Sequence, residues 1–238
     1  MKKIVLLLAA LVMVSSNGFS EEMKHEMKAN TGKKMPTRFQ AVSPDKAVIL
    51  QEGVNKMYCP KCGMTLPMFY KTNHAAHVHG KTEQYCSIHC LAETMADGAE
   101  VTGVQVVDNT TLKFIDVIRS WYVMGSDKPG TMSKTSKYAF GKKSDAEKFA
   151  KENGGKVMTY YAVLDSVKST FVQERAMIQK NQAMMAQKGE MMYTKMCTPV
   201  DGNFTSVAKA KSHLTTEKPC GDLNSMQLQA IGLYLKSR

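Results

Sequence analysis

The sequence predicts an α+β protein with two small, similar units followed by a helical C-terminal segment. Short apolar or alternating runs bounded by turn residues predict strands in both units. Each unit also contains one amphipathic stretch that predicts a helix, placed between strands. The order of these elements is the same in the two units, so they resemble a loose repeat. After residue 165 the pattern becomes helical.

The first unit is expected over residues 46–110. Residues 74–79 lack helical periodicity and predict a strand that ends at a glycine turn. Residues 86–96 predict a helix, because apolar side chains share one face and a glycine follows the end. Residues 104–107 and 112–118 predict two strands around an Asp-Asn turn.

The second unit is expected over residues 111–165 and has the same pattern. Its helix is predicted to begin at Ser144 as the N-cap, with Glu147 completing a capping box. The helix should end at the Asn-Gly-Gly run before a last strand. Short strands are predicted over residues 121–124, 138–140 and 156–160.

The remaining segments surround this core. Residues 1–20 predict a signal peptide, since Lys2 and Lys3 precede an apolar run of 11 residues, too short to span a bilayer core of about 30 Å. We therefore expect an exported, periplasmic protein, with no lipidation cysteine at the cleavage site and no later transmembrane segment. The other ranges are a flexible tail (21–45), a linker helix (166–188) and an appendage (189–238).

The composition excludes some function classes. The formal charge of +11 would favour nucleic-acid binding in a cytosolic protein, but export and scattered lysines favour a solvated basic surface instead. No Ser/His/Asp pattern, phosphate-binding glycine loop or metalloprotease His-Glu-x-x-His motif is present. We therefore expect a binding protein that is not an enzyme.

Four of the six cysteines form two closely spaced pairs. Cys59 and Cys62 form a Cys-x-x-Cys knuckle, and Cys86 and Cys90 lie at the expected start of a helix. Such spacing is typical of a metal site with two knuckles. The other two cysteines lie far along the chain, and a disulfide is their default in an oxidising compartment. They are Cys197 and Cys220.

The metal is not decided by spacing alone. Four thiolates suit structural Zn²⁺. Met64, two residues after Cys62, favours Cu(I), because a thioether is a poor zinc ligand and a good copper ligand. A redox-active Cys59–Cys62 disulfide is a third possibility. Histidine donors for copper stay open beside a purely structural role, at His74, His77, His79 and His89.

Two stretches resemble the NosL family of nitrous oxide reductase accessory proteins. The first is Cys59-Pro60-Lys61-Cys62-Gly63-Met64 with the later Tyr85-Cys86-Ser87, and the second is the run over residues 122–155. The resemblance covers residues 50–165. It implies two ββαβ-type halves and a monomeric periplasmic Cu(I) chaperone. Its partners would be apo nitrous oxide reductase, whose copper–sulfide centre it helps to assemble, and other copper-trafficking proteins.

The resemblance also implies a ligand set. Cys62, Met64 and Met132 would bind Cu(I), while Cys59, Cys86 and Cys90 would be supporting ligands or a second site. The zinc-stabilised four-cysteine interaction module remains the alternative. A third reading is an organometal lyase, because cysteine-based lyases can share this kind of fold.

Two features depart from the family pattern. Family members usually carry a lipid anchor, for which this chain shows no cysteine after its signal segment. The family core also lacks residues 189–238, which resemble a small c-type cytochrome. Since Cys197 is not part of a Cys-x-x-Cys-His run, this segment is expected to be a degenerate, haem-free appendage.

Overall fold

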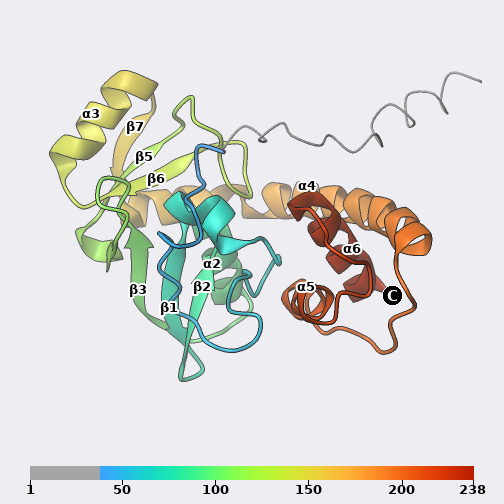
Figure 1. Cartoon of the computed structure of the whole chain (residues 1–238). Helices are drawn as coiled ribbons and strands as arrows, with labels where there is room; N and C mark the ends of the chain where they lie inside the picture. Colours follow the sequence, from blue (N-terminus) through green and yellow to red (C-terminus); the bar gives the residue numbers. More distant parts are fainter. Residues whose placement is uncertain (1–37) are drawn as a thin grey trace, which may run out of the picture. The chain divides into compact units, whose positions relative to one another are not determined.

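Two small antiparallel sheets and a long helix form the core of the protein (Figure 1). The structure is a computed structural model that describes residues Arg38–Arg238. The expected signal peptide and most of the expected tail lie outside the described residues. The fold is α+β, as the sequence predicts, and a helical C-terminal segment follows the two sheets in the chain.

The first half contains a four-stranded sheet in the order β2-β1-β3-β4. A 3₁₀ helix, η1 (Leu66–Thr72), leads into the central strand β1 (His74–Val78). Helix α2 (Ile88–Ala96) connects the second strand to the third. The other strands are β2 (Lys81–Tyr85), β3 (Val101–Val107) and β4 (Phe114–Asp116).

The second half repeats this arrangement with a three-stranded sheet in the order β6-β5-β7. Its first strand is again central and antiparallel to both neighbours, as β1 is in the first half. The short helix η2 (Val117–Arg119) joins the two halves. The expected repeat is therefore confirmed, with β4 as an extra edge strand. The elements of this half are β5 (Trp121–Met124), β6 (Lys137–Phe140), α3 (Lys143–Asn153) and β7 (Lys156–Thr159).

Helix α4 (Tyr160–Met196) contacts both halves and the C-terminal segment (Figure 1). Its first turns bury Val163 and Val167 against apolar residues of both sheets. Its last turns pack on α6, where a Cβ at Gly189 would lie 2.0 Å from the Ala230 carbonyl oxygen. The helix expected over residues 165–188 is thus present but longer at both ends. Helix α4 continues past Gly189, and the absence of a side chain at this position allows α6 to approach closely.

The C-terminal segment has its own small core beneath α5 (Val207–Thr216) and α6 (Ser225–Ser237). Leu214, Ile231 and Leu235 are buried in it. A disulfide joins Cys197 to Cys220, which confirms that expectation. Among residues 38–238, no helix is long and apolar enough to cross a membrane.

Two local predictions are wrong. Helix α3 begins at Lys143, not after Ser144, because the Lys142 carbonyl already accepts hydrogen bonds from the Asp145 and Ala146 amides. No side chain caps this end, so the predicted capping box is absent. Residues 38–45, assigned to a flexible tail, belong to the folded unit: Phe39 packs on the second half, and Gln40 is buried and donates to the Pro129 carbonyl.

Candidate metal centre

The loop that carries the first cysteine pair is closed by its own backbone. The Cys59 amide donates to the Met64 carbonyl at 2.9 Å, and the Gly63 amide donates to the Cys59 carbonyl at 2.8 Å. Gly63 has a φ of 72°, a conformation that favours glycine. This tight turn brings the Cys59 and Cys62 side chains to the same side of the loop. We call residues 59–64 the knuckle.

The second cysteine pair lies where β2 ends and α2 begins. Cys86 directly follows β2, and Cys90 is the third residue of α2. The Ser87 carbonyl accepts a hydrogen bond from the Leu91 amide and so starts the helix. The turn of the helix therefore places both sulfurs on the side that faces the knuckle.

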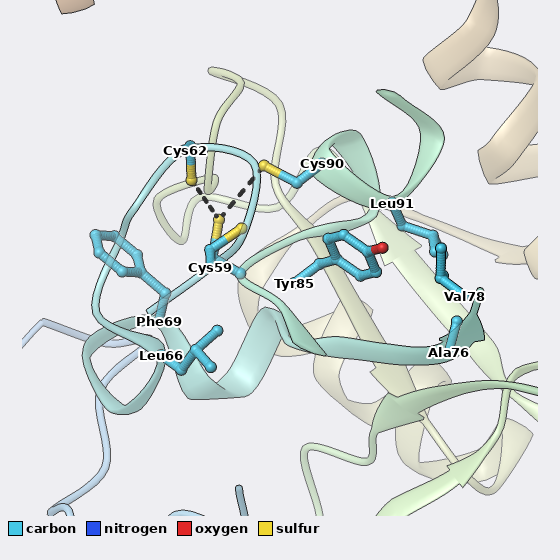
Figure 2. Close-up of a cluster of buried hydrophobic side chains, with 10 residues drawn as sticks. Cys59, Cys62, Leu66, Phe69, Ala76, Val78, Tyr85, Cys90 and Leu91 are labelled. Carbon is cyan, nitrogen blue, oxygen red and sulfur yellow. Dashed lines mark hydrogen bonds between the residues drawn. The ribbon is translucent and has the colours of Figure 1, made fainter. Parts of the chain in front are cut away.

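The structure brings all four sulfurs together, as the spacing predicts. They lie within 4.8 Å of one another, with Cys62 and Cys86 3.4 Å apart and Cys86 and Cys90 3.7 Å apart. Figure 2 shows the sulfurs of Cys62 and Cys90 on either side of a sulfur drawn beside Cys59, which both contact, within a cluster of apolar side chains. None of the four residues is more than 3% exposed. All four are free thiols, so no Cys59–Cys62 disulfide is present.

The clustered sulfurs shift the pKa values of Cys59, Cys86 and Cys90 in different directions. Burial opposes the charge on Cys59, but hydrogen bonds from Cys62, Cys86 and Cys90 hold its pKa well below the usual value. Burial raises the pKa of Cys86, and bonding to the other three sulfurs raises that of Cys90. Further thiolates therefore require a positive charge, which a soft metal ion supplies.

The two predicted methionine ligands lie at the edge of this cluster. Met64 and Met132 are partly exposed, and both pack against the buried group that contains the cysteines. Met132 has a φ of 64°, which is unusual for a residue with a side chain and marks a constrained loop. Thr72 anchors this loop, because its hydroxyl lies 2.9 Å from the Thr131 hydroxyl and 2.8 Å from the Cys86 carbonyl.

The four histidines do not extend this cluster. His74 is buried and uses both ring nitrogens: Nδ1 donates to the Thr72 carbonyl and Nε2 accepts from the Tyr122 hydroxyl. His89 is also buried, pairs with Glu174 at 3.1 Å and stacks on Phe171. His77 and His79 are exposed, and His79 belongs to the turn after β1. The structure therefore favours structural roles for His74 and His89.

Sequence reasoning missed two C-terminal residues that reach the knuckle. Lys211 of α5 donates to the Gly63 carbonyl at 2.7 Å, and Gln229 of α6 donates to the Cys62 carbonyl at 3.0 Å. Burial lowers the pKa of Lys211 to about 7, while the charges of Cys62, Cys59 and Cys86 act to raise it. No motif marks these positions, because they come to the site only through the packing of α4, α5 and α6.

Comparison with known proteins places the domain in a family. The NosL family model matches residues 53–168, which contain both cysteine pairs, Met64 and Met132. A crystal structure of the copper chaperone NosL from Shewanella denitrificans is similar, with 23% identity and a TM-score of 0.38, over 52% of this chain and 94% of that one. No curated protein matches the chain. Residues 53–168 of this chain therefore form a NosL domain, and a C-terminal segment follows beyond the matched region.

Proposed function

We propose that the protein is a periplasmic Cu(I) chaperone that delivers copper for the copper–sulfide centre of nitrous oxide reductase. One observation carries the proposal: four buried free thiols lie together in a NosL domain, and the partly exposed Met64 and Met132 pack against the apolar cluster that contains these thiols. NosL proteins are copper chaperones and not enzymes, so the domain acts by binding and release rather than by turnover.

The chemistry of the donors favours Cu(I). Thiolates and thioethers are soft ligands, and Cu(I) accepts low coordination numbers that leave a position for an incoming ligand. Cys59, Cys86 and Cys90 are fully buried, whereas Met64 and Met132 are partly exposed. Copper would therefore enter and leave past the methionines, with Cys62 and Met64 presenting it to the ligands of a receiving protein.

The partner is inferred from the family and from export. Apo nitrous oxide reductase is the expected acceptor, and other copper-trafficking proteins are expected donors. Delivery would occur in the periplasm by ligand exchange between the two proteins, with the chaperone acting as a monomer.

Replacing the methionines tests the copper proposal. Met64→Leu and Met132→Leu conserve volume and remove only the thioether, so packing is expected to change little. Anaerobic titration should show one Cu(I) per wild-type protein and about tenfold weaker binding in the double variant, corresponding to ~1.4 kcal/mol. Transfer of copper from the wild-type protein to apo nitrous oxide reductase is the second measurement. Met68→Leu, also partly buried against the cluster, is the matched control.

A specific observation supports structural zinc as the second candidate. A tetrahedral Zn²⁺ site with Zn–S bonds of about 2.3 Å places its sulfurs about 3.8 Å apart. The 3.4 and 3.7 Å sulfur separations are close to this value. Zinc binding that requires all four cysteines, unfolding on chelation, and Cu(I) binding unchanged by loss of both methionines would favour this candidate over the chaperone.

A further inference from the structure

One face of helix α5 lies directly on the knuckle and its flanks. Val207, Lys211 and Thr215 follow at intervals of four residues and so share this face. The Thr215 hydroxyl lies 2.9 Å from the hydroxyl of Tyr58, the residue before the knuckle. On the same helix, Ser212 donates to the Val54 carbonyl at 2.7 Å.

The contact with Gly63 is too close for any other residue. A Cβ at Gly63 would lie 2.3 Å from Val207 Cγ1. Gly63 is therefore required twice: its backbone conformation forms the turn of the knuckle, and its lack of a side chain lets α5 pack against the knuckle. Helix α5 packs as closely against α6 as against the knuckle: a Cβ at Gly232 of α6 would lie 2.6 Å from the Lys211 side chain.

Two polar side chains hold the knuckle backbone from the C-terminal segment. Lys211 Nζ donates to the Gly63 carbonyl, to Thr65 Oγ1 at 3.1 Å and to Gln229 Oε1 at 2.9 Å. The amide nitrogen of Gln229 in turn donates to the Cys62 carbonyl. Consecutive carbonyls of the knuckle, those of Cys62 and Gly63, are thereby fixed by two different helices.

The charge of Lys211 has no carboxylate partner within the described residues. Lys211 is 1% exposed, its three hydrogen-bond acceptors are neutral, and its ammonium lies 4.5 Å from the Tyr58 ring centroid. Burying an ammonium without an anion is unfavourable. A metal–thiolate cluster supplies a negative charge near Lys211, because two or more thiolates around one Cu(I) leave a net negative centre.

We propose that the C-terminal helices are a working part of the metal centre: Lys211 and Gln229 position the knuckle and Lys211 balances the negative charge of the loaded cluster. The inference rests on the proposed metal binding of the cysteines. Both residues lie beyond the region matched to the NosL family, residues 53–168. This segment therefore slows the escape of metal from a site that the family domain alone would hold less tightly.

Paired lysine substitutions on α5 test the proposal. Lys211→Met removes the buried charge, whereas Lys209→Met removes an exposed lysine from the same helix. The full chain is loaded with Cu(I) under anaerobic conditions, and its transfer to bathocuproine disulfonate is followed. Loss of an outer-sphere partner typically weakens metal binding about 10- to 100-fold. Lys211→Met should accelerate copper loss by about this factor, while Lys209→Met behaves as wild type.

Gln229→Ala keeps the test decisive if Lys211→Met does not fold. It removes the bond to the Cys62 carbonyl from a partly exposed position, and it should also accelerate release. Release from folded Lys211→Met or Gln229→Ala at the wild-type rate overturns the inference. Failure of the wild type to bind Cu(I) overturns the proposed function instead. In that case the inference is tested with Zn²⁺ in place of Cu(I), by following release of zinc to 4-(2-pyridylazo)resorcinol. Equal release rates for Lys211→Met and Lys209→Met would overturn it.

Discussion

The two halves of the protein share one architecture, but only the first contains cysteines within the described residues. In each half, one residue follows the second strand directly and another is the third residue of the helix. These positions are Cys86 and Cys90 in the first half, and Gly141 and Asp145 in the second. The Gly141 amide donates to Asp108 at 3.1 Å, and Asp145 accepts from Thr110 at 3.0 Å.

The helices of the two halves also differ in how far they are buried. Helix α2 is largely buried, whereas only Ala146 of α3 is buried. In the second half, hydrogen bonds to Asp108 and Thr110 occupy the positions where the first half presents sulfur. The strand-to-helix junction is thus a common scaffold. The chemistry depends on the residues at its two equivalent positions and on the knuckle, which precedes β1 in the first half.

Substitution at equivalent helix positions should give the largest difference between the halves in its effect on Cu(I) affinity. Cys90→Ala removes one of four clustered sulfurs and should weaken Cu(I) binding by more than the roughly 10- to 100-fold typical of losing a supporting group. Asp145→Ala should leave Cu(I) binding unchanged and alter the unfolding free energy by about 0.5 kcal/mol or less. Competition titration with a Cu(I) chelator measures both. Equal affinities for the two variants would mean that the helix of the first half is not part of the site.

Acid should weaken the junction between the halves. His74 of β1 bonds to Tyr122 of β5, and burial lowers the pKa of His74 to about 4 from 6.5. Above pH 6.5 the His74 ring is neutral in both the folded and the unfolded state, so the stability that comes from burying the neutral ring is fully present. Between about pH 6.5 and 4, only the unfolded state binds the proton. The unfolding free energy should therefore fall by ~1.4 kcal/mol per pH unit, about 3 kcal/mol in total.

Chemical denaturation at several pH values measures this effect. His74→Asn should flatten the profile relative to wild type, whereas His77→Asn, on the exposed side of the same strand, should keep the wild-type slope. A His74 variant with the wild-type slope would show that the acid sensitivity arises elsewhere.

The smallest expected effect concerns the helix without a cap. Lys142 is the N-cap of α3 and makes no side-chain capping bond. Lys142→Ser supplies a hydroxyl at this position and should raise the unfolding free energy by about 1 kcal/mol. Thermal unfolding measures the gain, and Cu(I) affinity should not change. A change in affinity would show that helix α3 is coupled to the metal centre.

Much of this structure could be predicted because local patterns determine it. The repeat, the two cysteine pairs and helix α2 follow from spacing and from short-range periodicity. The prediction of the α3 cap is wrong, because the Ser144-x-x-Glu147 pattern begins two residues after Lys142, whose carbonyl already starts the helix. The length of α4 was underestimated, because Gly189 suggests a break unless the packing partner Ala230 is known.

The outer part of the site depends on distant contacts. Lys211 and Gln229 are separated from the knuckle by well over a hundred residues and belong to no motif. The hydrogen bond at Nε2 of His74 likewise depends on Tyr122, which lies in the other half. Such residues become visible only when the tertiary packing is known.

The site formed by the four clustered cysteines, Met64 and Met132 is expected to bind Cu(I) in preference to zinc. X-ray absorption at the copper and zinc edges tests it most directly, using the full chain incubated anaerobically with equimolar Cu(I) and Zn²⁺ and then desalted. We expect one retained copper with only sulfur neighbours, and no stoichiometric zinc. One retained zinc with four sulfur neighbours, and copper lost on desalting, would contradict it.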